Sequence, residues 1–420
     1  MQLTQKIKIE PTKEQIIVLK DLSEKCRLIY NFGLQDRKLS YENKQKITYI
    51  DQQNKLPSIK EQWPEYKMVY SKVLQYVLRT LDANYKSFFE LRKNGDKDAM
   101  PPGFKGNKYF TTMVYNQSGF KYENSHIILS HKHPNKIPLK FKIPEKFYFD
   151  KISQISIYEK KKKYYISVTY EKSVKVFVQN NLYQAFDLGI NKQSCVNSYG
   201  KFKDFINPRI DKYWNKPIKI LQSRRDKYKK HSRRWEHLNN CFHRCNTKYS
   251  NQLIDYQHKL SRKIVNNTKA STIIVGDLDI KKMSKLTIKN TPKYEKMSYK
   301  DKKIALKKEK TLHHSLQSTG YISRLVHFLT YKSELVGKRT IKDDESYTSL
   351  TCCCCGKIKK KLPVSERIYK CDCGNLIDRD RNSSINIMKR FLSKNASWAG
   401  YQQFVDNLRK QGICIDIKFS

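Results

Sequence analysis

Acidic residues are scarce in this chain of 420 residues. Asp and Glu together number 39, whereas Lys and Arg number 85, which gives a formal net charge of +46. Self-repulsion on this scale opposes a compact fold unless a polyanion compensates for it. Because basic residues occur in nearly every stretch of the chain, we expect a nucleic acid to be held along much of the molecule. A basic protein that packages RNA without any chemistry is the alternative on charge alone.

Long apolar runs are absent as well. No run approaches the roughly 18 residues that a transmembrane helix requires, and the opening residues, MQLTQKIKIE, lack the apolar core of a signal peptide. We therefore expect no membrane partner and an intracellular location, in the cytoplasm or, in a eukaryotic host, in the nucleus. Six of the 11 cysteines cluster within residues 352–373, and clustering in an intracellular protein favours a metal site over a disulfide framework.

Hydrophobic periodicity predicts a mixture of helix and sheet in residues 1–180. Residues 3–10 alternate in polarity like a strand, and a capping box formed by Thr12 and Gln15 opens a helix. Residues 152–171 alternate on either side of a lysine-rich centre. They therefore predict a β-hairpin with a very basic turn.

The second half of the chain has a different order of elements. An apolar strand at 183–190 leads to a turn at Tyr199–Gly200, so three antiparallel strands are expected. Residues 211–267 almost lack Gly and Pro and predict one or two long basic helices. A buried strand at 272–275 and a helix at about 315–336 follow. This order is that of an RNase H-like α/β domain.

Two pairs of clustered cysteines have the spacing of a zinc site. One pair is CxxC followed by glycine, and the other is CxC followed by glycine. Four thiolates about 2.3 Å from one ion make a closed tetrahedral site, which is structural rather than catalytic. Cys353 and Cys354 compete for the first pair, but a knuckle of this length uses its outer cysteines; free buried cysteines are the alternative to a metal. The predicted Zn²⁺ ligands are Cys352, Cys355, Cys371 and Cys373.

The motif around these cysteines is long and ordered. Residues 348–387 read TSLTCCCCGKIKKKLPVSERIYKCDCGNLIDRDRNSSINI. This segment resembles the carboxyl-terminal signature of the TnpB family, in which TS-x-x-C-x-x-C-G precedes C-x-C-G or C-x-x-C-G and D-R-D-x-N-x-x-x-N-I. The resemblance extends over most of the chain. Segments that resemble the family's amino-terminal part are IKIEPTKEQIIVL (7–19), LIYNFGL (28–34), LDANYKSFF (81–89) and PPGFKGNK (101–108).

The resemblance implies an activity and its partners. TnpB proteins are transposon-encoded, RNA-guided DNA endonucleases, related to the Fanzor proteins and to type V CRISPR effectors. A member of this family is expected to bind a guide RNA and double-stranded target DNA, and to cut with a RuvC-like domain whose carboxylates hold Mg²⁺; we expect a monomer. Two such ions would activate a water and stabilise the leaving oxygen of a phosphodiester. The alternatives are a nuclease-inactive RNA-guided DNA-binding protein and an accessory protein of DNA transposition.

About three acids are expected to hold Mg²⁺. Asp187, within FDLGI, matches the first acid of the family. A lone carboxylate in a buried strand is costly unless it binds something, which favours the metal-binding interpretation. Asp380 matches the last acid. Its alternative role is to cap the helix that begins near Asp378.

The middle acid departs from the family pattern. In much of the family this strand ends apolar–Glu–Asp–Leu, and Gly276 stands where the ligating Glu is expected. Alternation along the strand places Asp277 and Asp279 on the opposite face from position 276. Because some branches of the family carry a relocated glutamate on the following helix, the resemblance implies Glu334 as the third Mg²⁺ ligand. A solvated glutamate beside lysines is the alternative at this position.

These predictions define an α+β, multidomain fold. A β-barrel and helical region that recognises nucleic acid is expected at 1–180, followed by the first part of a RuvC-like nuclease domain at 181–346. A zinc ribbon is inserted at 347–377. The end of the RuvC-like domain and a carboxyl-terminal tail occupy 378–420.

Overall fold

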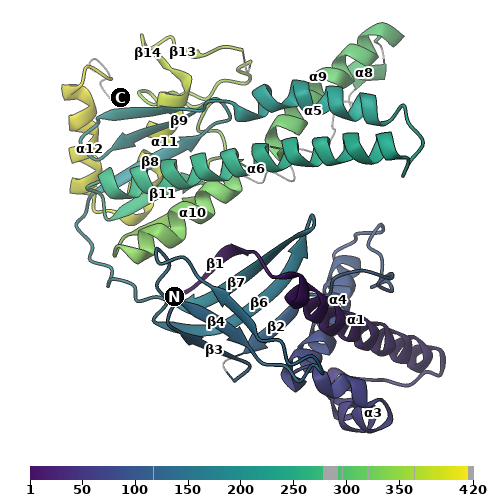
Figure 1. The fold of residues 1–420 in the computed structure, drawn as a ribbon. Coiled ribbons are helices and arrows are strands. Elements are labelled where there is room, and N and C mark those ends of the chain that lie inside the picture. The colour runs from purple at the N-terminus through teal and green to yellow at the C-terminus, as the bar shows by residue number, and fades with distance from the viewer. Residues whose placement is uncertain (117, 278–291, 296, 319–320, 364, 415–420) are drawn as a thin grey trace. The chain divides into compact units, whose positions relative to one another are not determined.

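The computed structural model describes all residues except 117, 278–291, 296, 319–320, 364 and 415–420 (Figure 1). The chain divides into two compact units, Met1–Ser173 and Val174–Ser420. Asp279, considered above beside Asp277, lies outside the described residues. Within the described part of the chain, no helix combines the length and apolar character needed to cross a bilayer.

The first unit contains two antiparallel sheets, with strand orders β1-β7-β6-β2 and β3-β4-β5. The strands are β1 (Gln2–Ile9), β2 (Met113–Asn116), β3 (Phe120–Glu123), β4 (His126–Leu129), β5 (Leu139–Lys142), β6 (Lys151–Lys160) and β7 (Lys163–Glu171). The β6–β7 hairpin confirms the one predicted at 152–171. Its turn residues, Lys161 and Lys162, both have positive φ, as two-residue hairpin turns require.

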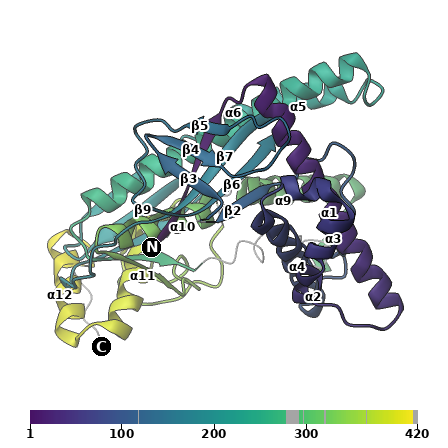
Figure 2. The same cartoon turned by 60° about the horizontal axis from the view of Figure 1, so that its bottom comes forward.

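Helices complete the first unit. They are α1 (Lys13–Glu42), α2 (Tyr49–Asn54), α3 (Leu56–Gln62) and α4 (Ser71–Lys93), with a 3₁₀ turn at Pro64–Met68. The capping box predicted at Thr12 and Gln15 is confirmed at the start of α1. Helices α1 and α4 lie side by side (Figure 2) and share one core with the sheets.

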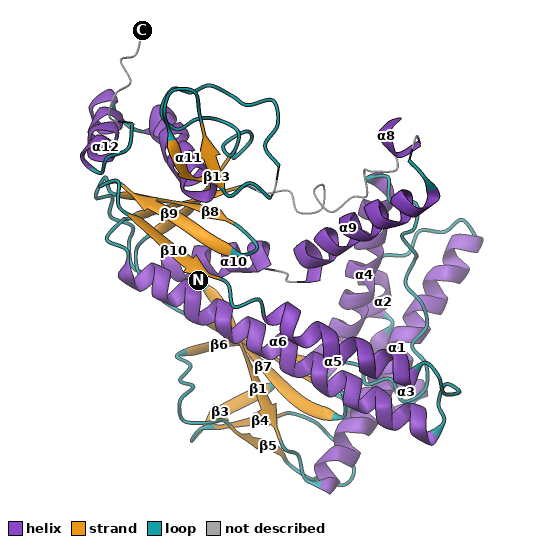
Figure 3. Ribbon diagram, turned by 90° about the horizontal axis from the view of Figure 1, so that it is seen from above, coloured by secondary structure: helices purple, strands orange, loops and turns teal. Residues whose placement is uncertain are grey.

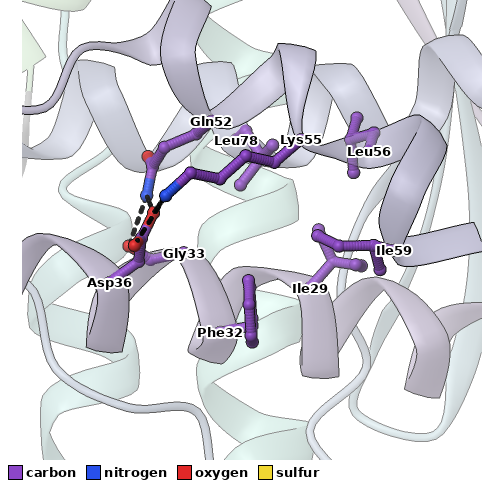
Figure 4. A pocket seen from close by; sticks show the side chains of 9 residues that line it. All are labelled: Ile29, Phe32, Gly33, Asp36, Gln52, Lys55, Leu56, Ile59 and Leu78. Atoms are coloured by element: carbon purple, nitrogen blue, oxygen red, sulfur yellow. Dashed lines mark hydrogen bonds and ion pairs between the residues drawn. The ribbon is translucent and has the colours of Figure 1, made fainter. Parts of the chain in front are cut away.

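A small pocket lies among α1, α2, α3 and α4 (Figure 4). Buried Gln52 donates hydrogen bonds to the carbonyl of Gly33 at 2.7 Å and to the carboxylate of Asp36 at 3.1 Å. Lys55 pairs with the same carboxylate at 3.0 Å. A Cβ at position 33 would lie 2.7 Å from Cδ2 of Leu78, so a larger residue there would force the Leu78 side chain to shift. These polar groups satisfy one another, so the pocket is a packing feature of the helices.

The second unit contains a five-stranded sheet with the order β10-β9-β8-β11-β12. The strands are β8 (Tyr183–Leu188), β9 (Lys192–Asn197), β10 (Phe202–Ile206), β11 (Thr272–Gly276) and β12 (Arg339–Asp343). The first three are antiparallel to one another, which confirms the expected meander, and β11 and β12 run parallel to β8. This mixed sheet is the centre of an RNase H-like domain.

The helices of the second unit connect and cover this sheet. They are α5 (Ile210–Arg225), α6 (Arg233–Asn267), α8 (Pro292–Glu295), α9 (Tyr299–Ser318), α10 (Tyr321–Leu335), α11 (Arg379–Asn395) and α12 (Trp398–Lys410). The prediction of long basic helices at 211–267 is confirmed by α5 and α6, which pack side by side (Figure 3).

The two faces of the sheet carry separate cores. Phe186 and Val275 pack in a cluster with residues of α6 and α10, whereas Ala185 and Ile274 pack in another cluster with residues of α11. Successive side chains of a strand point to opposite faces. The residues two positions after Ala185 and Ile274 therefore point to the α11 face, and these are Asp187 and Gly276.

Candidate active site

Three acidic residues come together where β8, β11 and β12 end. Phe186 pairs with Val275, so Asp187 lies beside Gly276, and Gly276 itself pairs with Asp343. The chain leaves β12 at Asp343 and reaches Glu345 two residues later. Helix α11 begins at Arg379 on the same face of the sheet, and its first turn carries Asp380. Asp187, Glu345 and Asp380 are hereafter called the acid cluster.

The pKa of Asp187 responds to the negative charges of the other two carboxyl groups. Burial raises the pKa of Asp187 to about 8, and the negative charges of Asp380 and Glu345 contribute to the increase, while a hydrogen bond from Ser383 opposes it. Burial also raises the pKa of Glu345 to about 7, together with the charges of Asp344 and Asp277. Carboxyl groups that resist ionisation together are stabilised as anions when a divalent cation lies between them.

The absence of a side chain at Gly276 makes room for Glu345. A Cβ placed on Gly276 would lie 1.5 Å from Oε2 of Glu345, so the glutamate occupies the space that a side chain at 276 would fill. This Oε2 atom is buried and has no hydrogen-bond partner in the described structure. A buried carboxylate oxygen without a partner is costly, and a bound cation would satisfy it. The acid cluster thus has the donor chemistry of a divalent-cation site, although its carboxylates lie farther apart than the sulfurs of the cysteine cluster.

Asp380 does not cap α11. Asp378 is the cap, and its Oδ1 accepts hydrogen bonds from the backbone N–H groups of Asp380 at 3.0 Å and Arg381 at 3.2 Å. The carboxylate of Asp380 lies 3.6 Å from Nζ of Lys192 and 4.0 Å from the guanidinium of Arg367. The alternative role considered for Asp380 is therefore filled by its neighbour.

Lys192 is a site residue that the sequence patterns did not indicate. It lies on β9, and its Nζ donates a hydrogen bond to Asp378 at 2.7 Å and lies 3.6 Å from Asp380 and 4.0 Å from Asp204. Although burial opposes charge on this ammonium, the hydrogen bond to Asp378 and the surrounding carboxylates raise its pKa. Lys192 therefore holds the start of α11 against the sheet beside the acid cluster.

The structure does not bring Glu334 to the acid cluster. Glu334 is exposed near the end of α10. The chain passes from there into the start of β12, where Arg339 pairs with Thr272, the first residue of β11. The acid cluster lies at the other end of these strands, four residues or about 13 Å away at 3.3 Å per residue. Because a helix that connects two parallel strands ends beside their starts, Glu334 is at the wrong edge.

Asp277 also points away from the acid cluster. Its exposed carboxylate lies 3.3 Å from Nζ of Lys342, and its backbone N–H donates to the carbonyl of Asp343 at 2.8 Å. Asp277 therefore continues the pairing of β11 with β12 and makes an ion pair at the surface. This position agrees with the face expected from alternation along the strand.

The four cysteines predicted to bind zinc come together in the loop between β12 and α11. Their sulfur atoms all lie within 4.8 Å of one another. The Sγ atoms of Cys352 and Cys373 are 3.6 Å apart, and those of Cys355 and Cys371 are 3.7 Å apart. A tetrahedral site with bonds of about 2.3 Å places its sulfurs about 3.8 Å apart. The geometry therefore fits a zinc ion.

Local structure explains how short segments create this cysteine cluster. The second cysteine pair lies in the hairpin of β13 (Ile368–Lys370) and β14 (Leu376–Asp378). Gly356 and Gly374, which follow the two pairs, have positive φ, a conformation that glycine adopts without steric cost. Burial opposes the Cys352 thiolate, but the backbone N–H groups of Cys355 and Cys354 outweigh burial and lower the pKa of Cys352 to about 7.

The two inner cysteines have other partners. Cys354 forms a disulfide with Cys414, and Sγ of Cys353 lies 3.8 Å from that of Cys354. Both inner cysteines are buried against the core on the α11 face. The disulfide ties the chain after α12 to the loop of the cysteine cluster.

The fold and the site define a class of protein: an RNase H-like α/β domain with a carboxylate cluster at the ends of its central strands, an inserted cysteine cluster, and a separate β-sheet and helical unit. Comparisons with known proteins show what three segments of the chain resemble. Residues 1–46 match a family model described as a helix-turn-helix domain. Residues 165–287 match the OrfB_IS605 model, described as a probable transposase, and residues 323–387 match a Cas12f1-like TNB domain. Over these segments the chain is similar to the TnpB/OrfB_IS605 family and to a Cas12f-like TNB domain.

Individual proteins show the same similarity. The chain is 22% identical over 402 residues to a putative RNA-guided DNA endonuclease of Streptomyces pristinaespiralis, covering 94% of this chain and 90% of the relative. It is 31% identical over 177 residues to the TnpB-like protein L79 of Acanthamoeba polyphaga mimivirus, a match to 42% of this chain and 30% of that protein. A solved Cas12f1–sgRNA–target DNA complex has the same fold, with a TM-score of 0.56, 14% identity, and coverage of 90% and 83%.

Proposed function

We propose that this protein is an RNA-guided DNA endonuclease of a transposable element, and that Asp187, Glu345 and Asp380 hold its catalytic Mg²⁺. The observation that carries the proposal is the contact between Gly276 and Glu345, since a Cβ at 276 would overlap the carboxylate. The acid that the family pattern places on β11 is missing, and a carboxylate from the segment after β12 fills the same space. Glu345 therefore replaces Glu334 as the proposed third ligand.

This substitution bears on the second candidate function, a nuclease-inactive DNA-binding protein. The motivation for that candidate was the glycine at 276, which cannot ligate a metal. Gly276 leaves room for the carboxylate of Glu345, whose Oε2 is buried and has no hydrogen-bond partner in the described structure. A metal ligand relocated from position 276 to position 345 would require this room. The raised pKa values of Asp187 and Glu345 support the same conclusion, because perturbed carboxyl groups grouped in one place are typical of functional sites.

The chain's own residues would organise phosphodiester hydrolysis as follows. Asp187 extends from the rigid centre of the sheet, Asp380 from the first turn of α11, and Glu345 from a loop that β12 positions. Lys192 and the cap residue Asp378 hold α11 in register with β9, which fixes Asp380. When bound, Mg²⁺ would lower the pKa of an attacking water and stabilise the leaving oxygen. The net charge of +46 favours binding of the guide RNA and of the target DNA.

The function is tested by cleavage of a DNA duplex that matches the guide. The full chain is co-purified with its RNA and incubated with target DNA and Mg²⁺. Cleavage that requires both the matching sequence and Mg²⁺, and that Asp187→Ala abolishes, supports the proposal. Guide-dependent binding without any nicking, by folded protein, would instead establish the nuclease-inactive candidate.

A further inference from the structure

The second unit contains a large cavity at the edge of the sheet opposite the acid cluster. Its volume is about 720 Å³, within the range of cavities that hold small ligands. Tyr183, the first residue of β8, lines it, whereas Asp187 lies near the end of that strand. The other walls come from the turn between β9 and β10 and from the junction of α11 and α12. The cavity is therefore separate from the proposed nuclease site.

No residue that lines this cavity is charged, although the chain carries a net charge of +46. Amide and hydroxyl groups provide its polar surface. The principal ones are those of Asn181, Ser198, Tyr199, Asn395, Gln403 and Asn407. A wall without charged side chains offers a phosphate or carboxylate ligand no ion-pair partner. A neutral polar ligand with its own donors and acceptors is compatible with these groups.

The amide of Gln403 is available for such a ligand. Gln403 lies on α12, is exposed, and makes no hydrogen bond within the described residues. The neighbouring Asn407 is fixed, because its Nδ2 donates to the carbonyl of Ser198 at 3.0 Å. A glutamine amide offers a donor and an acceptor side by side, the pattern that pairs with N7 and N6 of adenine.

The exposed ring of Tyr199 lines the cavity, and two further rings lie in the first turn of α12 outside the cavity lining. Tyr199 is 48% exposed, so one part of its ring remains available. Trp398, in the first turn of α12, is 73% exposed and stacks on Tyr401 with ring centroids 5.6 Å apart and an angle of 14°. Exposed aromatic rings bind unpaired bases of single-stranded nucleic acid by stacking.

We propose that this cavity binds an unpaired adenine base of a single-stranded nucleic acid, with Gln403 pairing to the base edge and Tyr199 stacking on its face. The inference rests on the proposed function only in taking a nucleic acid as the partner. The exposed side chain of Lys201, two residues after Tyr199, is available for the adjacent phosphate. RNA and DNA strands share the chemistry that the cavity recognises, and experiment distinguishes them.

The test measures binding of fluorescent ten-nucleotide single strands to the full chain by anisotropy. Each strand is a pyrimidine tract whose central position is varied. This position carries adenine, a pyrimidine (uracil in RNA, thymine in DNA) or no base, and each strand is made as RNA and as DNA. We expect the adenine strand to bind at least about fivefold more tightly than the abasic strand, since stacking of one base contributes an effect of this size. A preference for adenine over the abasic position in the RNA strands, in the DNA strands or in both supports the site. The strands that show the preference identify which nucleic acid the cavity binds.

Variants link this preference to the cavity. Gln403→Leu and Tyr199→Ala should each reduce the preference for adenine over the abasic strand to less than twofold. Gln402→Leu is the matched control, because Gln402 precedes Gln403 on α12 but does not line the cavity, and it should keep the preference. Equal binding of adenine, pyrimidine and abasic strands by the wild-type protein would overturn the proposal. An unchanged preference in both cavity variants would overturn it as well. Cleavage is measured separately, so loss of one function is distinguishable from loss of the other.

Discussion

Adding a single methyl group at Gly276 should disable the nuclease. The Cβ of Gly276→Ala would lie 1.5 Å from Oε2 and 2.5 Å from Cδ of Glu345. Non-bonded carbon and oxygen atoms require about 3.5 Å, so the carboxylate must move by about 2 Å. The backbone itself tolerates alanine, because Gly276 is not in the left-handed region. The substitution therefore displaces one carboxylate while leaving the strand intact.

The expected loss of activity follows from this displacement. A misplacement of about 1 Å in a catalytic group can lower the rate about 100-fold, so Gly276→Ala should reduce the single-turnover cleavage rate by at least that factor. Guide-dependent DNA binding should change less than about threefold, since the substitution alters no charge and displaces a single side chain. Cleavage and binding are measured on the same preparation with matching target DNA at saturating Mg²⁺.

A double mutant separates displacement of Glu345 from general damage. If Gly276→Ala acts only by moving the carboxylate, then adding it to Glu345→Ala should lower the rate no further. The pair Gly276→Glu with Glu345→Ala moves the acid back to β11, and should restore part of the activity that Glu345→Ala loses. A Gly276→Ala enzyme that cleaves within threefold of the wild type would refute the reasoning.

Three further predictions concern metal, pH and salt. Freshly purified protein should contain about one Zn²⁺ per chain. Cys371→Ser should reduce the zinc content to less than half and lower Tm by several degrees, because the ion orders the cysteine loop. Metal analysis that finds no zinc in the wild-type protein would contradict the four-thiolate site. In Mg²⁺-free protein, native Asp187 and Glu345 keep their protons up to pH values near 8 and 7, whereas the unfolded chain loses them near 4. The stability contributed by these protons is therefore present at low pH and is lost as pH rises from about 4 through 8. The Tm of the wild-type protein should fall by at least about 3 °C between pH 5.5 and 8.5. The Tm of Asp187→Asn should fall less over the same range. Mg²⁺ should raise Tm more at pH 8.5 than at pH 5.5, and an equal increase at both would exclude binding to the deprotonated cluster. Affinity for nucleic acid should fall steeply with salt, with a slope of log K against log[salt] of about −5 or steeper, whereas a slope near −1 would conflict with the interpretation of the charge.

Much of the fold follows from local patterns. The capping box at Thr12 and the alternation at 152–171 depend on residues close in sequence, so the helix and hairpin were predictable. The cysteine spacing was equally informative, since two short turns bring the four thiols together. The order of the sheet in the second unit was expected from the order of its elements.

The third acid could not be predicted in the same way. Its position depends on which end of α10 faces the carboxyl ends of the strands, and this depends on β12, a short strand that was not predicted. Once Asp343 is paired with Gly276, the next acids along the chain lie beside Asp187. The resemblance that implied Glu334 placed the acid on this helix but did not indicate which end of the helix meets the acid cluster. A strand prediction for TIKD at 340–343 would have supplied the missing signal.

The roles of the neighbouring residues also required three-dimensional contacts. Lys192 is an ordinary lysine in sequence, and only the pairing of β9 with β8 brings its ammonium to the start of α11. The polar groups around the large cavity come from segments more than 200 residues apart, such as those of Ser198 and Asn407. No periodicity or motif links these positions in the sequence.

The central claim is that a carboxylate from the segment after β12 completes the nuclease site. The most direct test compares Glu345→Gln with Glu334→Gln in Mg²⁺-dependent cleavage of a matching target by the RNA-bound protein. Both substitutions remove one negative charge and preserve side-chain size. We expect Glu345→Gln to lower the cleavage rate at least about 100-fold, and we expect Glu334→Gln to cleave within twofold of the wild type. The opposite result, with Glu334→Gln inactive and Glu345→Gln fully active, would contradict this claim.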